Sequence, residues 1–302
     1  MSKPSPRGIF LPIPTPFNVD GDLAVGALRD NLTRWNRHDL AGFVIAGSAG
    51  EAALLDEDEK IRLWQAAREM IPQDRLMIAG AGGEGTRATI RLTRLAAEAG
   101  AELALVVTPS YYHLLMTPDV LRAHYLAVAD AAPIPILIYN VPRYTGVNMN
   151  AATVVELSHH PNIIGVKECS GDLAKLGQVA QRTADNPHFA VLAGMGGALL
   201  PALAMGAVGG VLMLANLAPA ACIQIYRLYQ AGDWAKARQI QARLVPLNTV
   251  VAKRLGPPGL KAALDMLGYY GGAVRPPLGP PSDSERAALR AVLAEAGLYN
   301  EK

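Results

Sequence analysis

The chain has 302 residues, of which 51% are hydrophobic and 18% are charged, and its formal net charge is +2. This near-neutral balance, with Lys and Arg scattered along the chain, excludes an electrostatic basis for nucleic-acid binding and favours a small-molecule partner. The charged fraction lies below the roughly 25% typical of soluble domains, so we expect part of the surface to be buried between the subunits of an oligomer.

Along residues 1–216, short apolar runs rich in Val, Ile and Leu alternate with helical patterns. Near-continuous apolar strands separated by amphipathic helices are typical of a parallel sheet covered by helices. Eight such units predict an α/β fold closed into a TIM (β/α)8 barrel. The predicted strands lie at 9–17, 42–47, 76–82, 103–109, 134–140, 163–169, 189–194 and 209–214. The clearest helical patterns between them lie at 57–70, 86–99, 118–131 and 150–159.

After residue 216 the strand pattern stops and helical periodicity continues, over 218–231, 234–253, 259–267 and 282–296. Prolines at 257 and 258, and a proline-rich run at 275–281, separate the last three of these segments. No linker rich in Gly, Ser or charge precedes them. We therefore predict that residues 217–302 form a C-terminal helical extension packed on the barrel.

Several other classes of protein are disfavoured. Residues 189–226 carry no charge and are long enough to span a membrane, but Gly and Pro divide them into shorter elements, so we predict no membrane partner. The histidines and the cysteines, Cys169 and Cys222, show no ligand spacing, which predicts no metal and reduced thiols. Residues 1–8 lack the apolar centre of a signal peptide, so we expect a cytoplasmic protein.

The carboxyl ends of two successive predicted strands carry Tyr139 and Lys167. The strand-to-helix loops of an α/β barrel gather at that face, where the chemistry of such barrels takes place. A lysine at the end of a buried strand loses its proton readily by desolvation and can attack a carbonyl to form a Schiff base. A nearby tyrosine could then move protons. The alternative for Tyr139 is a phenol that only closes the top of the barrel.

Two further loops could join this site. Residues 47–51, with the sequence Gly-Ser-Ala-Gly-Glu, could hold a carboxylate on their N–H groups while Ser48 relays a proton, although an ordinary turn is the alternative. Glu51 could act as an acid or fix the loop by accepting backbone hydrogen bonds. After the predicted strand 103–109, Tyr111 or Tyr112 could complete the proton relay.

Two motifs suggest other chemistry but have simpler explanations. Residues 80–85 fit the G-x-G-x-x-G pattern of dinucleotide sites, but the next strand ends in Thr108-Pro109 instead of an acidic residue that could hold a ribose. The acidic run 56–59 is explained as a helix start, with Asp56 as the N-cap and Glu59 as its capping-box partner. We therefore predict no cofactor.

Taken together, the residues resemble the dihydrodipicolinate synthase and N-acetylneuraminate lyase family of Schiff-base lyases that handle pyruvate. The likeness covers essentially the whole chain and is carried by 47–51, 139–142 and 165–168, together with the strand ends at Pro16, Pro109 and Gly194. It implies a barrel with a C-terminal helical segment, usually a homotetramer, that acts on a 2-oxo acid. The catalytic set it implies is Lys167 as the Schiff-base lysine and Tyr139 as the proton shuttle, with Ser48 and Tyr111. The substrate-binding set is Ser48, Ala49, Tyr112, Arg143, Tyr144, Cys169, Gly194 and Val211.

The resemblance also bears on the substrate. Dihydrodipicolinate synthases usually carry two threonines where this chain has Ser48 and Ala49. They carry an arginine that grips the carboxylate of aspartate semialdehyde where this chain has Tyr144, and Arg143 could substitute for it. The second half, including 160–165, 206–211 and 268–272, is most similar to 4-hydroxy-2-oxoglutarate aldolase, with Cys169 where that enzyme has a serine.

We therefore expect cleavage of 4-hydroxy-2-oxoglutarate to pyruvate and glyoxylate. The alternatives are a dihydrodipicolinate synthase, which joins pyruvate to aspartate semialdehyde, and another 2-oxo acid aldolase or dehydratase of the family. A binding protein that kept the barrel but lost turnover is a third alternative, which the pairing of Tyr139 with Lys167 disfavours.

Overall fold

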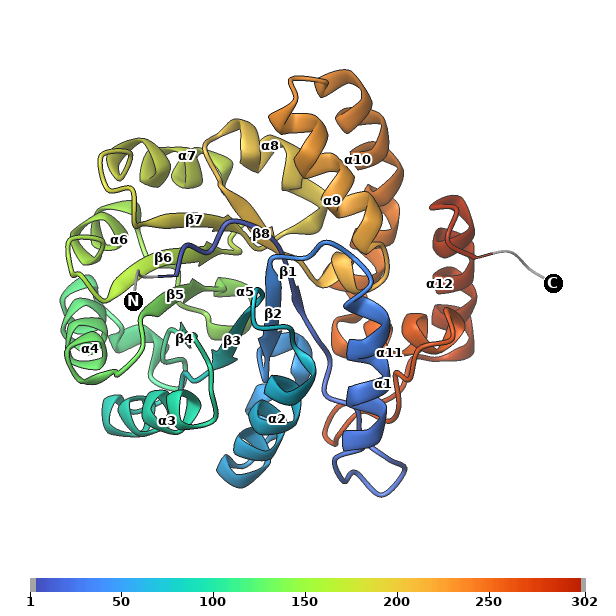
Figure 1. Ribbon diagram of the computed structural model, residues 1–302, viewed down its shortest axis with the longest axis horizontal. Helices are drawn as coiled ribbons and strands as arrows, with labels where there is room; N and C mark the ends of the chain where they lie inside the picture. Colours follow the sequence, from blue (N-terminus) through green and yellow to red (C-terminus); the bar gives the residue numbers. More distant parts are fainter. Residues whose placement is uncertain (1–3, 300–302) are drawn as a thin grey trace.

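Eight parallel strands close into a barrel in which each strand pairs with the next along the chain and β8 pairs with β1 (Figure 1). The computed structural model describes residues 4–299, so residues 1–3 of the N-terminal stretch considered above lie outside the described residues. The predicted TIM barrel is confirmed. The strands are β1 (Gly8–Pro12), β2 (Gly42–Ile45), β3 (Leu76–Gly80), β4 (Leu103–Val107), β5 (Ile136–Asn140), β6 (Ile163–Glu168), β7 (Ala190–Ala193) and β8 (Gly209–Val211).

Helices cover the outside of the barrel (Figure 1). The second of them begins at the capping box expected from the acidic run, because the Asp56 side chain accepts from the Glu59 N–H and the Glu59 side chain accepts from the Asp56 N–H. The helices are α1 (Val25–Trp35), α2 (Glu57–Met70), α3 (Thr86–Glu98), α4 (Pro118–Ala131), α5 (Pro142–Thr145), α6 (Ala151–Leu157), α7 (Leu173–Arg182) and α8 (Leu199–Ala204).

The strand side chains form two apolar layers, because successive residues of a strand point to opposite faces. One layer fills the inside of the barrel and includes Phe10, Val44, Ile78 and Leu137. The other packs the outer face of the strands against the helices. The barrel is therefore a filled core, and its functional surface is confined to the loops at its ends.

Several strands are shorter than the apolar runs that predicted them. The run 9–17 yields only β1, since Pro14 and Pro16 have no N–H to donate to a neighbouring strand. The run 209–214 yields β8 and then the 3₁₀ turn η5 (Met213–Asn216). Within residues 4–299 no helix is both long and apolar enough to cross a membrane, and the uncharged stretch 189–226 is divided among several elements.

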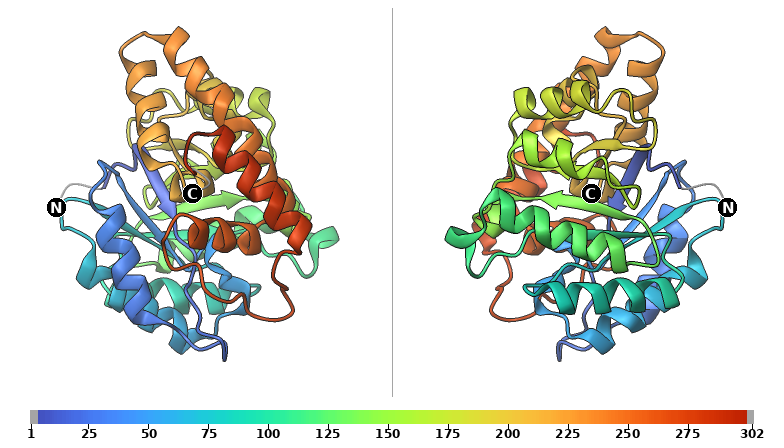
Figure 2. Two further views of the ribbon diagram at one scale, coloured as in Figure 1. Left: turned by 90° about the vertical axis from the view of Figure 1, so that its right-hand side faces the viewer. Right: turned by 90° about the vertical axis from the view of Figure 1, so that its left-hand side faces the viewer.

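The C-terminal helices pack beside one another on one side of the barrel, as the orange and red ribbons in Figures 1 and 2 show. They are α9 (Pro219–Gln230), α10 (Trp234–Asn248), α11 (Pro257–Met266) and α12 (Asp283–Glu295). The helix predicted over 234–253 is an α-helix only as far as Asn248. It becomes a π-helix over Thr249–Leu255 and ends at Gly256, where φ is 65°. Such π turns occur frequently at functional sites.

Candidate active site

Tyr139 and Lys167 lie side by side at the carboxyl ends of β5 and β6, where the strand register pairs them directly. The Lys167 ammonium nitrogen is 4.1 Å from the centre of the Tyr139 ring, and only 4% of the lysine is exposed. Burial lowers the pKa of Lys167, and the nearby Cys169 partly opposes that shift. The amine therefore reaches its neutral, nucleophilic form at a lower pH than a solvated lysine.

The Tyr139 hydroxyl donates a hydrogen bond to Ser48 Oγ at 3.2 Å. Burial raises the pKa of Tyr139 well above its usual value, so the phenol keeps its proton and is available as a donor. Ser48 begins the short 3₁₀ turn η1 (Ser48–Gly50), which follows β2. The first N–H groups of such a turn have no partner inside it, so those of Ser48 and Ala49 are available to an acceptor.

Cys169 follows β6 and lies beside the end of β7. A Cβ atom added at Gly194 would lie 1.8 Å from Cys169 Sγ, so this strand end has no room for a side chain. Burial raises the pKa of the Cys169 thiol to about 11, with Glu168 raising it further and Lys167 opposing the shift. The sulfur is therefore present as a thiol at neutral pH. Val211 ends β8, and its buried side chain also lines the pocket.

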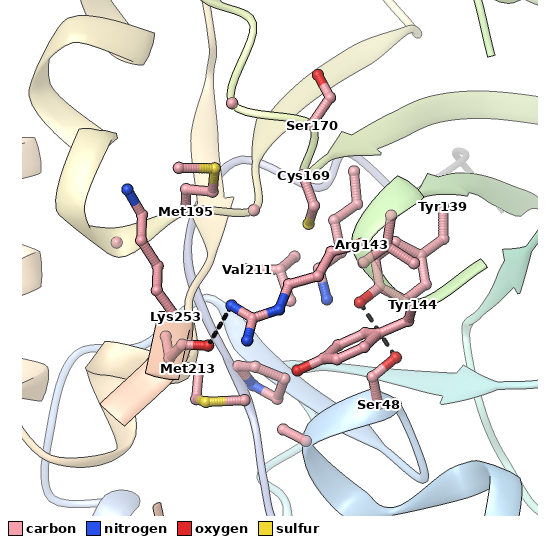
Figure 3. Close-up of a pocket in the computed structure, with 18 of the residues that line it drawn as sticks. Ser48, Tyr139, Arg143, Tyr144, Cys169, Ser170, Met195, Val211, Met213 and Lys253 are labelled. Carbon is pink, nitrogen blue, oxygen red and sulfur yellow. Dashed lines mark hydrogen bonds between the residues drawn. The ribbon is translucent and has the colours of Figure 1, made fainter. Parts of the chain in front are cut away.

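A pocket of about 400 Å³ opens over these groups at the carboxyl end of the barrel (Figure 3). It brings together most of the residues singled out in the sequence, although they come from loops far apart in the chain. Those that line it are Ser48, Ala49, Tyr139, Arg143, Tyr144, Lys167, Cys169, Gly194 and Val211.

Tyr111 and Tyr112 do not line this pocket. They are 78% and 65% exposed, and their rings contact each other edge to face. Glu84 holds the start of their loop, because its carboxylate accepts from the Ser110 N–H, the Ser110 hydroxyl and the Tyr111 N–H. In a single chain these tyrosines therefore lie apart from Tyr139 and Lys167.

The first two glycines of the G-x-G-x-x-G motif, Gly80 and Gly82, have a packing role. A Cβ at Gly80 would lie 2.0 Å from the Ala46 carbonyl oxygen, and one at Gly82 would lie 2.6 Å from the Val107 nitrogen. Close approach of neighbouring strand ends accounts for both glycines. Glu84, in the same segment, holds the tyrosine loop. Within residues 4–299, no group of three or more His, Cys, Asp or Glu side chains is placed to hold a metal ion.

The C-terminal segment contributes pocket residues that the sequence pattern did not indicate. Asn248, Ala252 and Lys253 come from the end of α10 and the π-helix, and Arg143 donates to the Ala252 carbonyl oxygen at 3.2 Å. Figure 3 shows the Arg143 side chain between Tyr144 and Lys253. Two cationic side chains thus lie at the exposed side of the pocket, away from Ser48. The periodicity predicted a helix here but gave no sign that its end reaches the site.

The sequence profile of the Dihydrodipicolinate synthetase family matches residues 5–296. The chain belongs to this family. Members are Schiff-base enzymes that make or break carbon–carbon bonds, so the protein is a class I pyruvate-dependent enzyme of the aldolase type. Membership of an enzyme family disfavours the alternative of a binding protein that kept the barrel but lost turnover.

Similar proteins match the chain over nearly its full length. A 4-hydroxy-tetrahydrodipicolinate synthase from Methanothrix thermoacetophila is 38% identical over 289 residues, which cover 96% of each chain. The dihydrodipicolinate synthase of Thermotoga maritima superposes with a TM-score of 0.92 at 29% identity and covers 97% of this chain and 99% of its own. The Acinetobacter baumannii dihydrodipicolinate synthase, solved with pyruvate, superposes with a TM-score of 0.90 at 30% identity and covers 97% of this chain and 99% of its own.

Proposed function

We propose that this family member joins pyruvate to a small aldehyde that carries its own acidic group, with aspartate semialdehyde as the first candidate. The observation that carries the proposal is the buried pair of Lys167 and Tyr139 beneath a pocket whose exposed side holds two cations. Relatives named 4-hydroxy-tetrahydrodipicolinate synthase support this assignment over the 4-hydroxy-2-oxoglutarate cleavage expected from the sequence.

The first step uses the neutral amine of Lys167. Its nitrogen adds to the C2 ketone carbon of pyruvate, and the resulting carbinolamine loses its hydroxyl as water to give an iminium. The Tyr139 hydroxyl supplies the proton that this leaving water needs, and the Ser48 hydroxyl donates a hydrogen bond to the phenolate that remains. The N–H groups of Ser48 and Ala49 hold the pyruvate carboxylate, which places the ketone over the amine.

The second step forms the carbon–carbon bond. The iminium withdraws electrons, so the Tyr139 phenolate takes a proton from C3 of the bound pyruvate, which restores the phenol and gives an enamine. The enamine carbon attacks the aldehyde carbon, the aldehyde oxygen becomes a hydroxyl by taking the proton of Tyr139, and the iminium returns. Water then adds to the iminium carbon and gives a proton to the Tyr139 phenolate, and collapse of the carbinolamine to the ketone frees Lys167. The same steps in reverse cleave the bond.

The exposed side of the pocket favours an acidic aldehyde. Arg143 and Lys253 both line it, and a carboxylate or another anion would neutralise their charge. Tyr144, between them and Ser48, supplies a hydroxyl that can donate to the same ligand.

Glyoxylate is the second candidate for the aldehyde. The observation that favours it is the departure at Tyr144 and Ala49 from the residues usual in dihydrodipicolinate synthases. Glyoxylate also carries a carboxylate, but it is shorter than aspartate semialdehyde and has no amino group. Its reaction with pyruvate would give 4-hydroxy-2-oxoglutarate.

We also infer that a second copy of the chain covers the loop that carries Tyr111 and Tyr112. Leu114 and Leu115 are exposed next to them, so four large apolar or aromatic side chains are clustered on one surface loop. Such a cluster favours a protein interface. Association would place these tyrosines against a neighbouring chain, in keeping with the expected homotetramer. The unpaired thiols of Cys169 and Cys222 fit the expected cytoplasmic location.

The test is a turnover assay that follows pyruvate consumption with each aldehyde in turn. We expect turnover with aspartate semialdehyde, a lower kcat/KM with glyoxylate, and no turnover by Lys167→Ala with either. A higher kcat/KM with glyoxylate would replace the first candidate by the second. Equal rates with an uncharged aldehyde of similar length would overturn the requirement for an acidic group.

A further inference from the structure

A buried carboxylate lies directly after the turn that carries Ser48 and Ala49. Glu51 is 3% exposed, and its Oε1 is 2.5 Å from the ammonium nitrogen of Lys261, which is 1% exposed. Its other oxygen, Oε2, accepts a hydrogen bond from the backbone N–H of Arg275 at 2.9 Å. Both partners belong to the C-terminal segment, more than 200 residues away in the chain. Glu51 does not line the pocket, so it has no direct part in the chemistry described above.

The partners of Glu51 are themselves held firmly. Lys261 lies on α11, which packs against η1, and donates to the Ala273 carbonyl oxygen at 2.6 Å. The Arg275 guanidinium donates to both carboxylate oxygens of Glu59 at 2.6 Å. The cationic groups of Lys261 and Arg275 lie 4.4 Å and 4.2 Å from the centre of the Phe17 ring. The C-terminal segment thus presents a fixed cation and a fixed N–H to the carboxylate.

The backbone around Ser48 needs such an anchor. Ala46 and Glu51, on either side of the turn, have φ values of 56° and 57°, in the left-handed region that side chains other than Gly rarely adopt. Residues held in this region cost on the order of 1 kcal/mol or more and persist only where their surroundings hold them. The Thr15 hydroxyl also donates to the Gly50 carbonyl oxygen at 2.6 Å. The turn is therefore strained and held from both sides.

Stability alone is a poor explanation for this ion pair. Removing two charges from water costs several kcal/mol per ion, and an apolar pair of similar volume is often as stable or more stable. A buried ion pair does fix the orientation of its side chains, because the Glu51 carboxylate must point at the Lys261 ammonium group. Burial lowers the pKa of Lys261 and the adjacent Glu51 opposes that shift, so the charge on the lysine depends on its partner.

We propose that Glu51 and Lys261 are positioning residues, through which the C-terminal segment holds the turn so that Ser48 meets Tyr139 and the Ser48 and Ala49 N–H groups face the pocket. This inference rests on the proposed Schiff-base function. It assigns the C-terminal segment a second part in the site, in addition to the pocket residues Asn248, Ala252 and Lys253.

The experiment compares the double variant Glu51→Gln/Lys261→Met with its two single variants and the wild type. The double variant removes both charges, keeps the side-chain length at residue 51, shortens the side chain at residue 261 by one atom and leaves an amide oxygen for the Arg275 backbone N–H. Each single variant should have a lower Tm than the double variant, because it alone leaves a buried charge without its partner. The pyruvate concentration that gives half-maximal trapping of Lys167 by borohydride should rise about tenfold or more in the double variant.

The control is Arg68→Met/Glu102→Gln, which removes a partly buried ion pair that does not line the pocket and whose carboxylate also accepts from a backbone N–H. Glu102 pairs with Arg68 at 2.7 Å and accepts from the Met77 N–H at 2.8 Å, at the start of β3. The control double variant and its two single variants should change Tm but leave pyruvate trapping as in the wild type. If the double variant at Glu51 and Lys261 regains both Tm and wild-type trapping, the pair is only structural and the inference is wrong.

Two further outcomes keep the tests separate. If saturating pyruvate gives no trapped adduct in the wild type, the proposed function fails before the positioning role is tested. If the double variant does not fold, Glu51→Asp is used alone, because it keeps both charges and draws the carboxylate back by one methylene. A folded Glu51→Asp protein with trapping and kcat within about twofold of the wild type would overturn the inference, since a displacement of about 1 Å in a catalytic group can cost about 100-fold in rate.

Discussion

Replacing Gly194 with Ala should destabilise the protein and drive Cys169 toward the pocket. The new Cβ would lie 1.8 Å from Cys169 Sγ and 2.9 Å from the Glu168 carbonyl oxygen. Since non-bonded heavy atoms settle at about 3.5–4.0 Å, the thiol must rotate or the end of β7 must shift. Overpacking of this kind costs about 1–3 kcal/mol. Each kcal/mol lowers Tm by roughly 2–4 °C in a chain of a few hundred residues.

A double-mutant cycle with Cys169→Ala tests whether the sulfur is the conflicting atom. The alanine removes the 1.8 Å contact but leaves the Glu168 oxygen at 2.9 Å and the residue 169 Cβ at 3.1 Å. We therefore expect partial rescue, with a coupling of roughly 0.5–3 kcal/mol measured by thermal or urea unfolding. The KM for pyruvate should rise in Gly194→Ala and recover in the double variant. Strictly additive losses of stability would refute the assignment of the conflict to the sulfur.

Three further predictions concern the proton donor, the aldehyde and stability. Tyr139→Phe should lower kcat by roughly 10²–10⁴-fold, and the reduced adduct on Lys167 should still form but more slowly, because the leaving water has lost its proton donor; a kcat near that of the wild type would remove the phenol from the relay. Lys253→Gln should raise KM for aspartate semialdehyde about two- to tenfold, with little change for pyruvate or in the control Arg254→Gln, whose side chain does not line the pocket. Burial lowers the pKa of His124, so the folded protein holds it neutral while the unfolded chain takes up a proton. Stability should therefore fall as pH drops below about 6.5, by up to about 1.4 kcal/mol per pH unit, and less so in His124→Asn, as urea unfolding at pH 5 and pH 7 would show.

The barrel could be predicted because its information is local. Each buried strand is a run of Val, Ile and Leu, and Tyr139 and Lys167 end two of these runs in register. The strand ends were harder to place. Prolines shorten β1, and a register shift between Ile136 and Leu137 sets which side chains of β6 face inward. Neither effect is visible in hydrophobic periodicity alone.

The rest of the site depends on contacts between distant parts of the chain. Lys253 reaches the pocket because a π-helix follows α10, and the apolar pattern over 234–253 does not distinguish a π turn from an α-helix. Glu51 pairs with Lys261, which lies 210 residues later in the chain, and no local sequence motif predicts such a partner. Tyr111 and Tyr112 have the expected position after β4, but their loop runs outward in a single chain. A single sequence cannot show what a second copy would add there.

The central claim, that Lys167 forms a Schiff base with a 2-oxo acid, is tested most directly by intact-protein mass spectrometry after incubation with pyruvate and borohydride. The wild type should gain one reduced pyruvyl group, located on Lys167 by peptide mapping, and Lys167→Ala should gain none. An unmodified wild type at saturating pyruvate, or an adduct that persists in Lys167→Ala, would contradict the account.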